Sequence, residues 1–154
     1  MPATDMLDNL IQNAAKLMRE QAAAYRRLDA ACQQLCAALV GGQPEVIESL
    51  TRAGEAELLK MRVRLVELMT ALSTFAERHA GGQGALGAET RVAFRDASSE
   101  LLQAAQTFQR TQARAAAVAN NGASFAAAGI EICGVAPLTY RAPYTRSGEA
   151  KLWA

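Results

Sequence analysis

The chain has 154 residues, 51% of them hydrophobic, and its 16 basic and 15 acidic side chains leave a formal charge of +1. This length fits one domain, and the near-neutral charge argues against nucleic-acid binding, which usually needs a basic face. The sequence has no run of about twenty apolar residues and no signal-peptide core in MPATDMLDNL, so we expect a cytoplasmic protein without membrane insertion.

The first predicted helix covers about residues 5–40. Apolar residues recur at alternating steps of four and three from Leu7 to Leu39, and only Gln21 interrupts this row. Such spacing is typical of helices that pack lengthwise at a shallow angle. The glycine pair 41–42 then predicts the end of the helix.

The second predicted helix covers residues 44–79 and begins with Pro44, a residue suited to the first helical position. Gly54 lies within its apolar row, where either a close backbone crossing or simple tolerance would explain a glycine. His79 lies at the end of this helix. The row that we expect to face the core is Ile47, Leu50, Gly54, Leu58, Met61, Leu65, Leu68, Leu72 and Phe75.

The sequence GGQGALG, residues 81–87, predicts a flexible linker to a third helix over about 88–132. The third helix is rich in alanine, so its apolar row is thin. The triplet Asn120-Asn121-Gly122 would normally signal a turn, yet apolar residues continue at helical spacing to Ile132. We therefore expect a helix that its own sequence stabilises only weakly.

The predicted fold class is all-α: an elongated antiparallel bundle of three long helices over residues 1–133. Two long helices joined by a short turn must run antiparallel, and we expect the third to pack along the groove between them. Pro137 and Pro143 exclude helix from the segment 134–154, which we expect to be a loose or extended tail.

The sequence offers little chemistry, so we expect no enzyme, no cofactor and no metal site. His79 is the only histidine, and no CxxC motif accompanies Cys32, Cys36 and Cys133, which we interpret as reduced, buried small residues. Histidine phosphotransfer domains are also small helical bundles, but their histidine lies in the middle of a helix. The basic stretch KMRVRL, residues 60–65, is either a solvated face or a surface for an acidic partner.

Binding through apolar surface is the remaining hypothesis. The alanine-rich third helix buries little apolar surface. The larger apolar residues that this leaves available for a partner helix are Phe108, Val118, Phe125, Ile130 and Ile132. Alternatively, these residues complete the intramolecular core. In the extended tail, Tyr140, Tyr144 and Trp153 supply further adhesive side chains.

A leucine-rich helix runs into ALVGGQPEVIESLTRAGEAELLKMRVRL, and the tail contains Tyr144-Thr-Arg-Ser-Gly148. In this organisation the chain resembles the FlgN-type family of flagellar type III export chaperones, whose members often end in a Tyr-x-x-x-Gly element of the same spacing. The resemblance implies a cytosolic, non-catalytic chaperone that binds hook–filament junction proteins before export.

The resemblance also implies which residues bind partners. The helical termini of the junction proteins would contact the end of the third helix and the residues after it, and the cytoplasmic export gate would contact Tyr140 or Tyr144. A structural adaptor that self-associates or binds another helix is the alternative, and homo-oligomerisation is left open. The residues implied for the client are Val118, Phe125, Ile130, Ile132, Val135 and Leu138.

Overall fold

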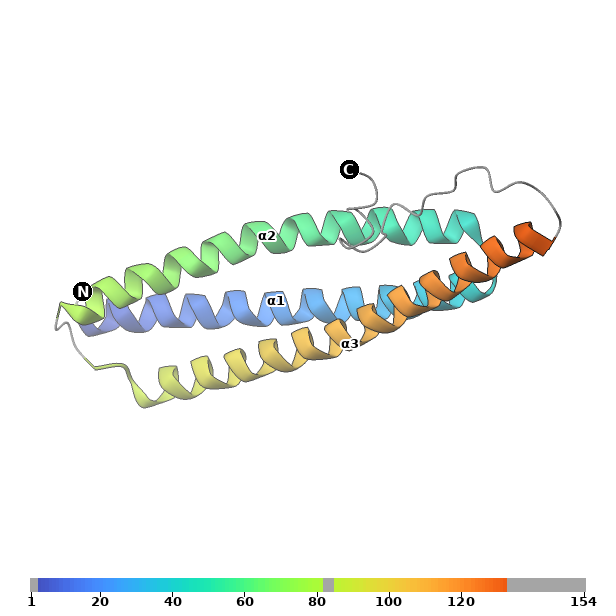
Figure 1. Cartoon of the computed structure of the whole chain (residues 1–154). Coiled ribbons are helices and arrows are strands. Elements are labelled where there is room, and N and C mark those ends of the chain that lie inside the picture. Colours follow the sequence, from blue (N-terminus) through green and yellow to red (C-terminus); the bar gives the residue numbers. More distant parts are fainter. Residues whose placement is uncertain (1–2, 82–84, 133–154) are drawn as a thin grey trace, which may run out of the picture.

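The computed structural model describes residues 3–81 and 85–132, and within these ranges the chain forms three helices and no strand (Figure 1). Helix α1 spans Ala3–Val40, α2 spans Pro44–Ala80 and α3 spans Ala88–Ile132. The all-α fold class is confirmed, and the predicted helix boundaries agree to within two residues. The predicted tail, 134–154, lies outside the described residues.

The turn between α1 and α2 forms where the glycine pair predicts it. Gly42 has a φ of 62°, a left-handed conformation that glycine adopts without a steric penalty. The amide of Gly41 donates to the carbonyl of Ala37 over 2.9 Å, and that of Gln43 to Ala38 over 3.0 Å. These bonds satisfy carbonyls at the end of α1, and Pro44 then begins α2.

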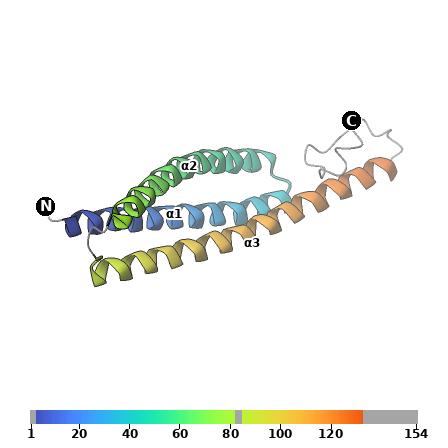
Figure 2. The same cartoon turned by 60° about the vertical axis from the view of Figure 1, so that its left-hand side comes forward.

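Helix α1 lies in the middle of the bundle, with α2 antiparallel and α3 parallel to it (Figures 1 and 2). Among the described residues, no Cα atom of α2 lies within 8 Å of one in α3. The prediction that the third helix packs between the first two is therefore wrong. The physical reason is that α1 has apolar side chains on two of its sides, and a different helix packs against each side.

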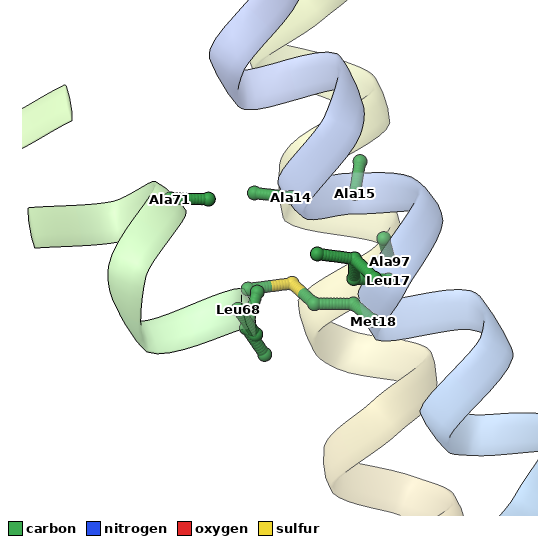
Figure 3. Packing of buried hydrophobic residues seen from close by; sticks show 7 residues of the cluster. All are labelled: Ala14, Ala15, Leu17, Met18, Leu68, Ala71 and Ala97. Carbon is green, nitrogen blue, oxygen red and sulfur yellow. The ribbon is translucent and has the colours of Figure 1, made fainter. Parts of the chain in front are cut away.

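The main core surrounds the N-terminal half of α1. Met18 points toward Leu68 of α2, and Ala14 faces Ala71 (Figure 3). On the other side, Ala97 of α3 is fully buried in the same cluster as Ala14. Alanine at these positions lets the helices approach closely, so the core is a narrow seam of small side chains with few large ones.

Two polar side chains are buried in the described part of the chain, Gln21 and Thr90. Gln21, the residue that interrupts the apolar row of α1, donates from Nε2 to the backbone carbonyl of Met61 over 3.2 Å. Its Oε1 atom is also buried and has no hydrogen-bond partner among the described residues. Gln21 therefore links α1 to α2 through a single hydrogen bond, and it fixes their relative register rather than adding apolar burial.

The start of α3 is attached to α1 through the end of the linker. Asp8 accepts a hydrogen bond from the amide of Gly87 over 3.0 Å, and Gly87 in turn accepts from the amide of Arg91 in the first turn of α3. A Cβ atom at position 87 would lie 3.1 Å from a carboxylate oxygen of Asp8. Glycine at this position therefore allows the close approach that holds α3 beside α1.

An ion pair joins α1 to α2 near the middle of the bundle. Arg27 donates to the Glu57 carboxylate over 2.6 Å, and Arg64 lies 3.8 Å from the same carboxylate. The hydrogen bond from Arg27 lowers the pKa of Glu57, burial opposes this, and the charges of Arg27, Arg64 and Lys60 lower the pKa further. The folded state therefore favours the ionised carboxylate.

Replacement of Glu57 by Gln is expected to reduce the free energy of unfolding by up to about 1 kcal/mol near pH 7. Because the pKa of Glu57 is lowered on folding, its contribution is complete above the ordinary value of 4.5 and is lost as the pH falls through the lower, folded-state value. Urea unfolding at about pH 7 and about pH 3 measures this. The control Glu77→Gln, at an exposed site without an ion pair among the described residues, should show no such loss.

Candidate helix-binding groove

An apolar groove opens between α2 and α3 at the end of the bundle where α1 turns into α2. It has a volume of about 490 Å³, and all three helices contribute to its walls. Its floor is the C-terminal half of α1. Its large apolar lining residues are Leu28, Leu35, Leu39, Leu50, Leu58 and Phe108, and its small ones include Ala31, Cys32, Gly54, Ala115, Ala116 and Ala119.

The groove exists because the apolar row of α1 is covered less completely toward its C-terminal end. Leu7 and Ile11 are buried at the start of α1, whereas Leu35 and Leu39 are only half-buried. At this end, α3 presents mainly alanine to α1, and α2 and α3 do not close over the row. Apolar side chains that would be core in a closed bundle therefore remain accessible.

Gly54 forms part of the groove wall rather than a close helix crossing. A Cβ atom at this position would meet only the Cδ2 atom of Leu28, at 4.0 Å, which is an ordinary van der Waals contact. Of the two explanations that the sequence allows, the structure favours tolerance over a close crossing. A side chain at position 54 would also project toward the groove, so glycine keeps this part of the wall open.

Aromatic packing defines the inner end of the groove. The rings of Tyr25 and Phe108 lie 5.6 Å apart between centroids and are tilted by 44°. Both pack against the buried cluster of Ala24, Leu28 and Met61. Phe108 therefore has two roles, because one part of its ring completes the core while it also lines the groove.

Cys32 is half-buried on the groove floor, and its neighbour Cys36 is half-buried too. Burial raises the pKa of the Cys32 thiol, and the nearby Cys36 and Asp29 raise it further. The thiol is thus neutral at physiological pH and behaves as a small apolar surface. The sequence predicted buried cysteines; the structure shows partial burial, and Cys133 lies outside the described residues.

The structure places only some of the residues implied to bind partners. Val118 is half-buried on α3, one turn from the groove residue Ala115. Phe125, Ile130 and Ile132 fall within the backbone of α3, but their side chains are not described. The remaining implied residues, all outside the described residues, are Val135, Leu138, Tyr140, Tyr144 and Trp153.

The end of α3 extends beyond the turn that joins α1 to α2 (Figures 1 and 2). The helix continues through Asn120, Asn121 and Gly122, all of which are exposed, so the predicted turn signal does not end it. Because α1 ends at Val40, the last turns of α3 have no part of α1 beside them. This end of α3 is continuous with the groove, which reaches Ala119.

The apolar rows that are predicted for the first two helices include the large groove residues Leu35, Leu39, Leu50 and Leu58. Leu58 and Leu65 are in fact exposed, so the prediction that the whole row of α2 faces the core is wrong. The row winds around the helix and leaves α1. An available signal was the low number of large apolar residues on the third helix, which leaves the rows of the first two helices without enough partners.

Two other features of the sequence have clear positions. His79 is exposed, one residue before the end of α2, and its ring stacks on Phe75 with centroids 5.4 Å apart. Within the basic stretch 60–65, Lys60 and Arg62 are exposed, whereas Arg64 is half-buried beside Glu57. The stretch is therefore only partly a solvated face.

The fold and the groove together define an up–down–up three-helix bundle with one open apolar side.

Comparison of the chain with protein-family models, with curated proteins and with solved structures finds no match. None of the helices in the described part of the chain has a stretch long and apolar enough to cross a membrane. In the same part, no three histidine, cysteine or acidic side chains are grouped so that they could hold a metal ion.

Proposed function

We propose that this protein is a non-catalytic chaperone that binds the apolar helical terminus of a client. The observation that carries the proposal is the apolar groove between α2 and α3, which has the form of a bundle lacking one helix. An amphipathic helix would cover Leu35, Leu39 and Leu58 and would complete a four-helix arrangement. Binding would bury apolar surface of both partners away from water.

The resemblance described above supports a particular client class for this groove. The proposed clients are hook–filament junction proteins of the bacterial flagellum, held in the cytoplasm before type III export. Apolar helical ends of such proteins would self-associate if left uncovered, and a chaperone groove would replace these contacts. Tyr140 or Tyr144 in the tail would then bind the cytoplasmic export gate.

A moderate affinity follows from the way the site is built. The groove is open along one side, and α3 continues beyond it into turns that have no neighbour in α1. A client helix that orders further residues of this chain would lose part of its binding free energy to that ordering. Moderate affinity suits a chaperone, because the client has to be released at the export gate.

Truncation after Asn121 is expected to weaken client binding about tenfold or more, because it removes the end of α3 and the tail together. The experiment is calorimetric titration of the full chain and of the truncated chain with a peptide from the helical terminus of a hook–filament junction protein. Equal affinities would contradict a role for the end of α3 and the tail. No binding to either chain would contradict the client class itself.

A further inference from the structure

Helix α2 has a second apolar row, on the side facing away from α1. Leu59, Val63 and Val66 are 65%, 55% and 66% exposed, and Ala56 and Thr70 extend the row at either end with steps of three and four. The buried residues Met61 and Leu68 lie on the opposite side of the helix. This row, which we call the outer stripe of α2, is therefore separate from both the core and the groove.

The spacing of this row is that of a helix–helix seam. Residues at alternating steps of three and four form one continuous stripe, which is the pattern found where two helices pack lengthwise. Thr70 fits the stripe because its hydroxyl donates to the carbonyl of Val66 over 2.8 Å and leaves its methyl group for packing. A contiguous stripe of this kind on a monomer indicates an interaction surface.

The charges beside the stripe indicate which partner fits. Lys60 and Glu67 each come directly after a stripe residue in the sequence and therefore lie along one flank of the stripe. Glu55 and Arg62 each come directly before a stripe residue and lie along the other flank. All four side chains are exposed, and within 3–81 and 85–132 none of them forms an ion pair. Each flank thus carries one charge of each sign, and a partner of a single sign would repel half of them.

We propose that this stripe is the contact surface for a second copy of the chain, with the two α2 helices antiparallel. A two-fold axis between Val63 and Val66 would bring each flank against the same flank of the second copy. Lys60 would then lie opposite Glu67 of the second copy, and Glu67 opposite its Lys60. Both pairs have opposite charges, so a second copy of the chain complements the charges on this flank.

The charges on the flanks are complementary in a parallel copy as well, because Lys60 would then lie near Glu55 and Glu67 near Arg62. The two orientations are therefore separated by the second test described below. Helix α2 bows away from α1 (Figure 2), so two copies that pack through their outer sides would touch over only part of the stripe, and their association would depend on concentration.

The first test is sedimentation equilibrium of the full chain. The expected result is a mass that rises with concentration from 16.4 kDa toward twice that value. Val63→Lys should weaken association about tenfold or more, whereas the control Val92→Lys, at an exposed valine of α3, should leave it unchanged. A chain that stays monomeric at every concentration, or equal effects of the two variants, would overturn the proposal.

The second test addresses the orientation. Lys60→Glu and Glu67→Lys should each weaken association, because each brings like charges together across the antiparallel contact. The double variant with both changes should restore it. In a parallel pair, the same double variant would place like charges beside Glu55 and Arg62, so failure of this restoration would overturn the antiparallel arrangement. The stripe lies opposite the core side of α2, so neither test depends on client binding in the groove.

Discussion

Replacement of Leu28 by Ala is expected to lower the free energy of unfolding by about 3 kcal/mol, the largest stability effect of any single change considered. Leu28 is only 4% exposed and packs with Ala24 and Met61 where the narrow core meets the groove. Few large side chains contribute to this core, so neighbouring residues cannot readily fill the space that the leucine leaves. The expected decrease in the free energy of unfolding therefore includes both the transfer free energy of the leucine side chain and the cost of the cavity that it leaves.

Urea unfolding followed by circular dichroism measures this effect, with the slope of the transition expected to stay constant. Leu102→Ala is the matched control, because it deletes the same atoms from a leucine that is 60% exposed on α3. The control should change the free energy of unfolding by less than about 0.5 kcal/mol. A similar, small change in both variants would show that the bundle does not depend on the Leu28 cluster.

Tryptophan in place of Ala116 is expected to weaken binding of the client helix about tenfold or more without loss of stability. Ala116 lines the groove and is exposed, so an indole there would occupy the space of the incoming helix and not disturb the core. Ten-fold weaker binding corresponds to about 1.4 kcal/mol. Calorimetric titration with the junction-protein peptide would measure it, and thermal unfolding would show whether folding is unchanged.

Ala117→Trp is the control for the groove variant. Ala117 is also exposed but does not line the groove, because one residue along a helix is a rotation of about 100°. It should leave affinity unchanged. If both variants bound the peptide with the same affinity as the original chain, the client would bind elsewhere on the protein. The truncation experiment would then show whether it binds at the end of α3 and the tail.

The groove and the outer stripe of α2 are compatible with one another. The groove lies between α2 and α3, whereas the stripe of Leu59, Val63 and Val66 faces away from α1. A dimer formed through the two α2 helices would leave one groove open on each copy. The proposed assembly could thus hold two client helices, and both grooves would be available for loading and release.

The positions of the helices were predictable from local signals in the sequence. Gly41 and Gly42 end α1, and Pro44 begins α2, because these residues restrict backbone conformation whatever the surrounding structure is. The long helical repeat likewise predicted α3 through Asn121, where a turn signal alone would have ended it. At the turn between α1 and α2 the information lies within a few residues of the position that it determines, whereas for α3 it is spread along the whole repeat.

The partner of each apolar face was decided only by the tertiary structure. Periodicity places Leu58, Leu65 and Leu68 on a helix, but it does not determine how far that helix is rotated toward its neighbours or how far apart two neighbours lie. Alanine-rich α3 packs against α1 and not against α2, because no Cα atom of α2 lies within 8 Å of one in α3, so Leu58 lines an open groove while Leu68 is buried. The sequence by itself determined three long helices; the balance of large and small side chains between them, realised only on packing, determined the groove.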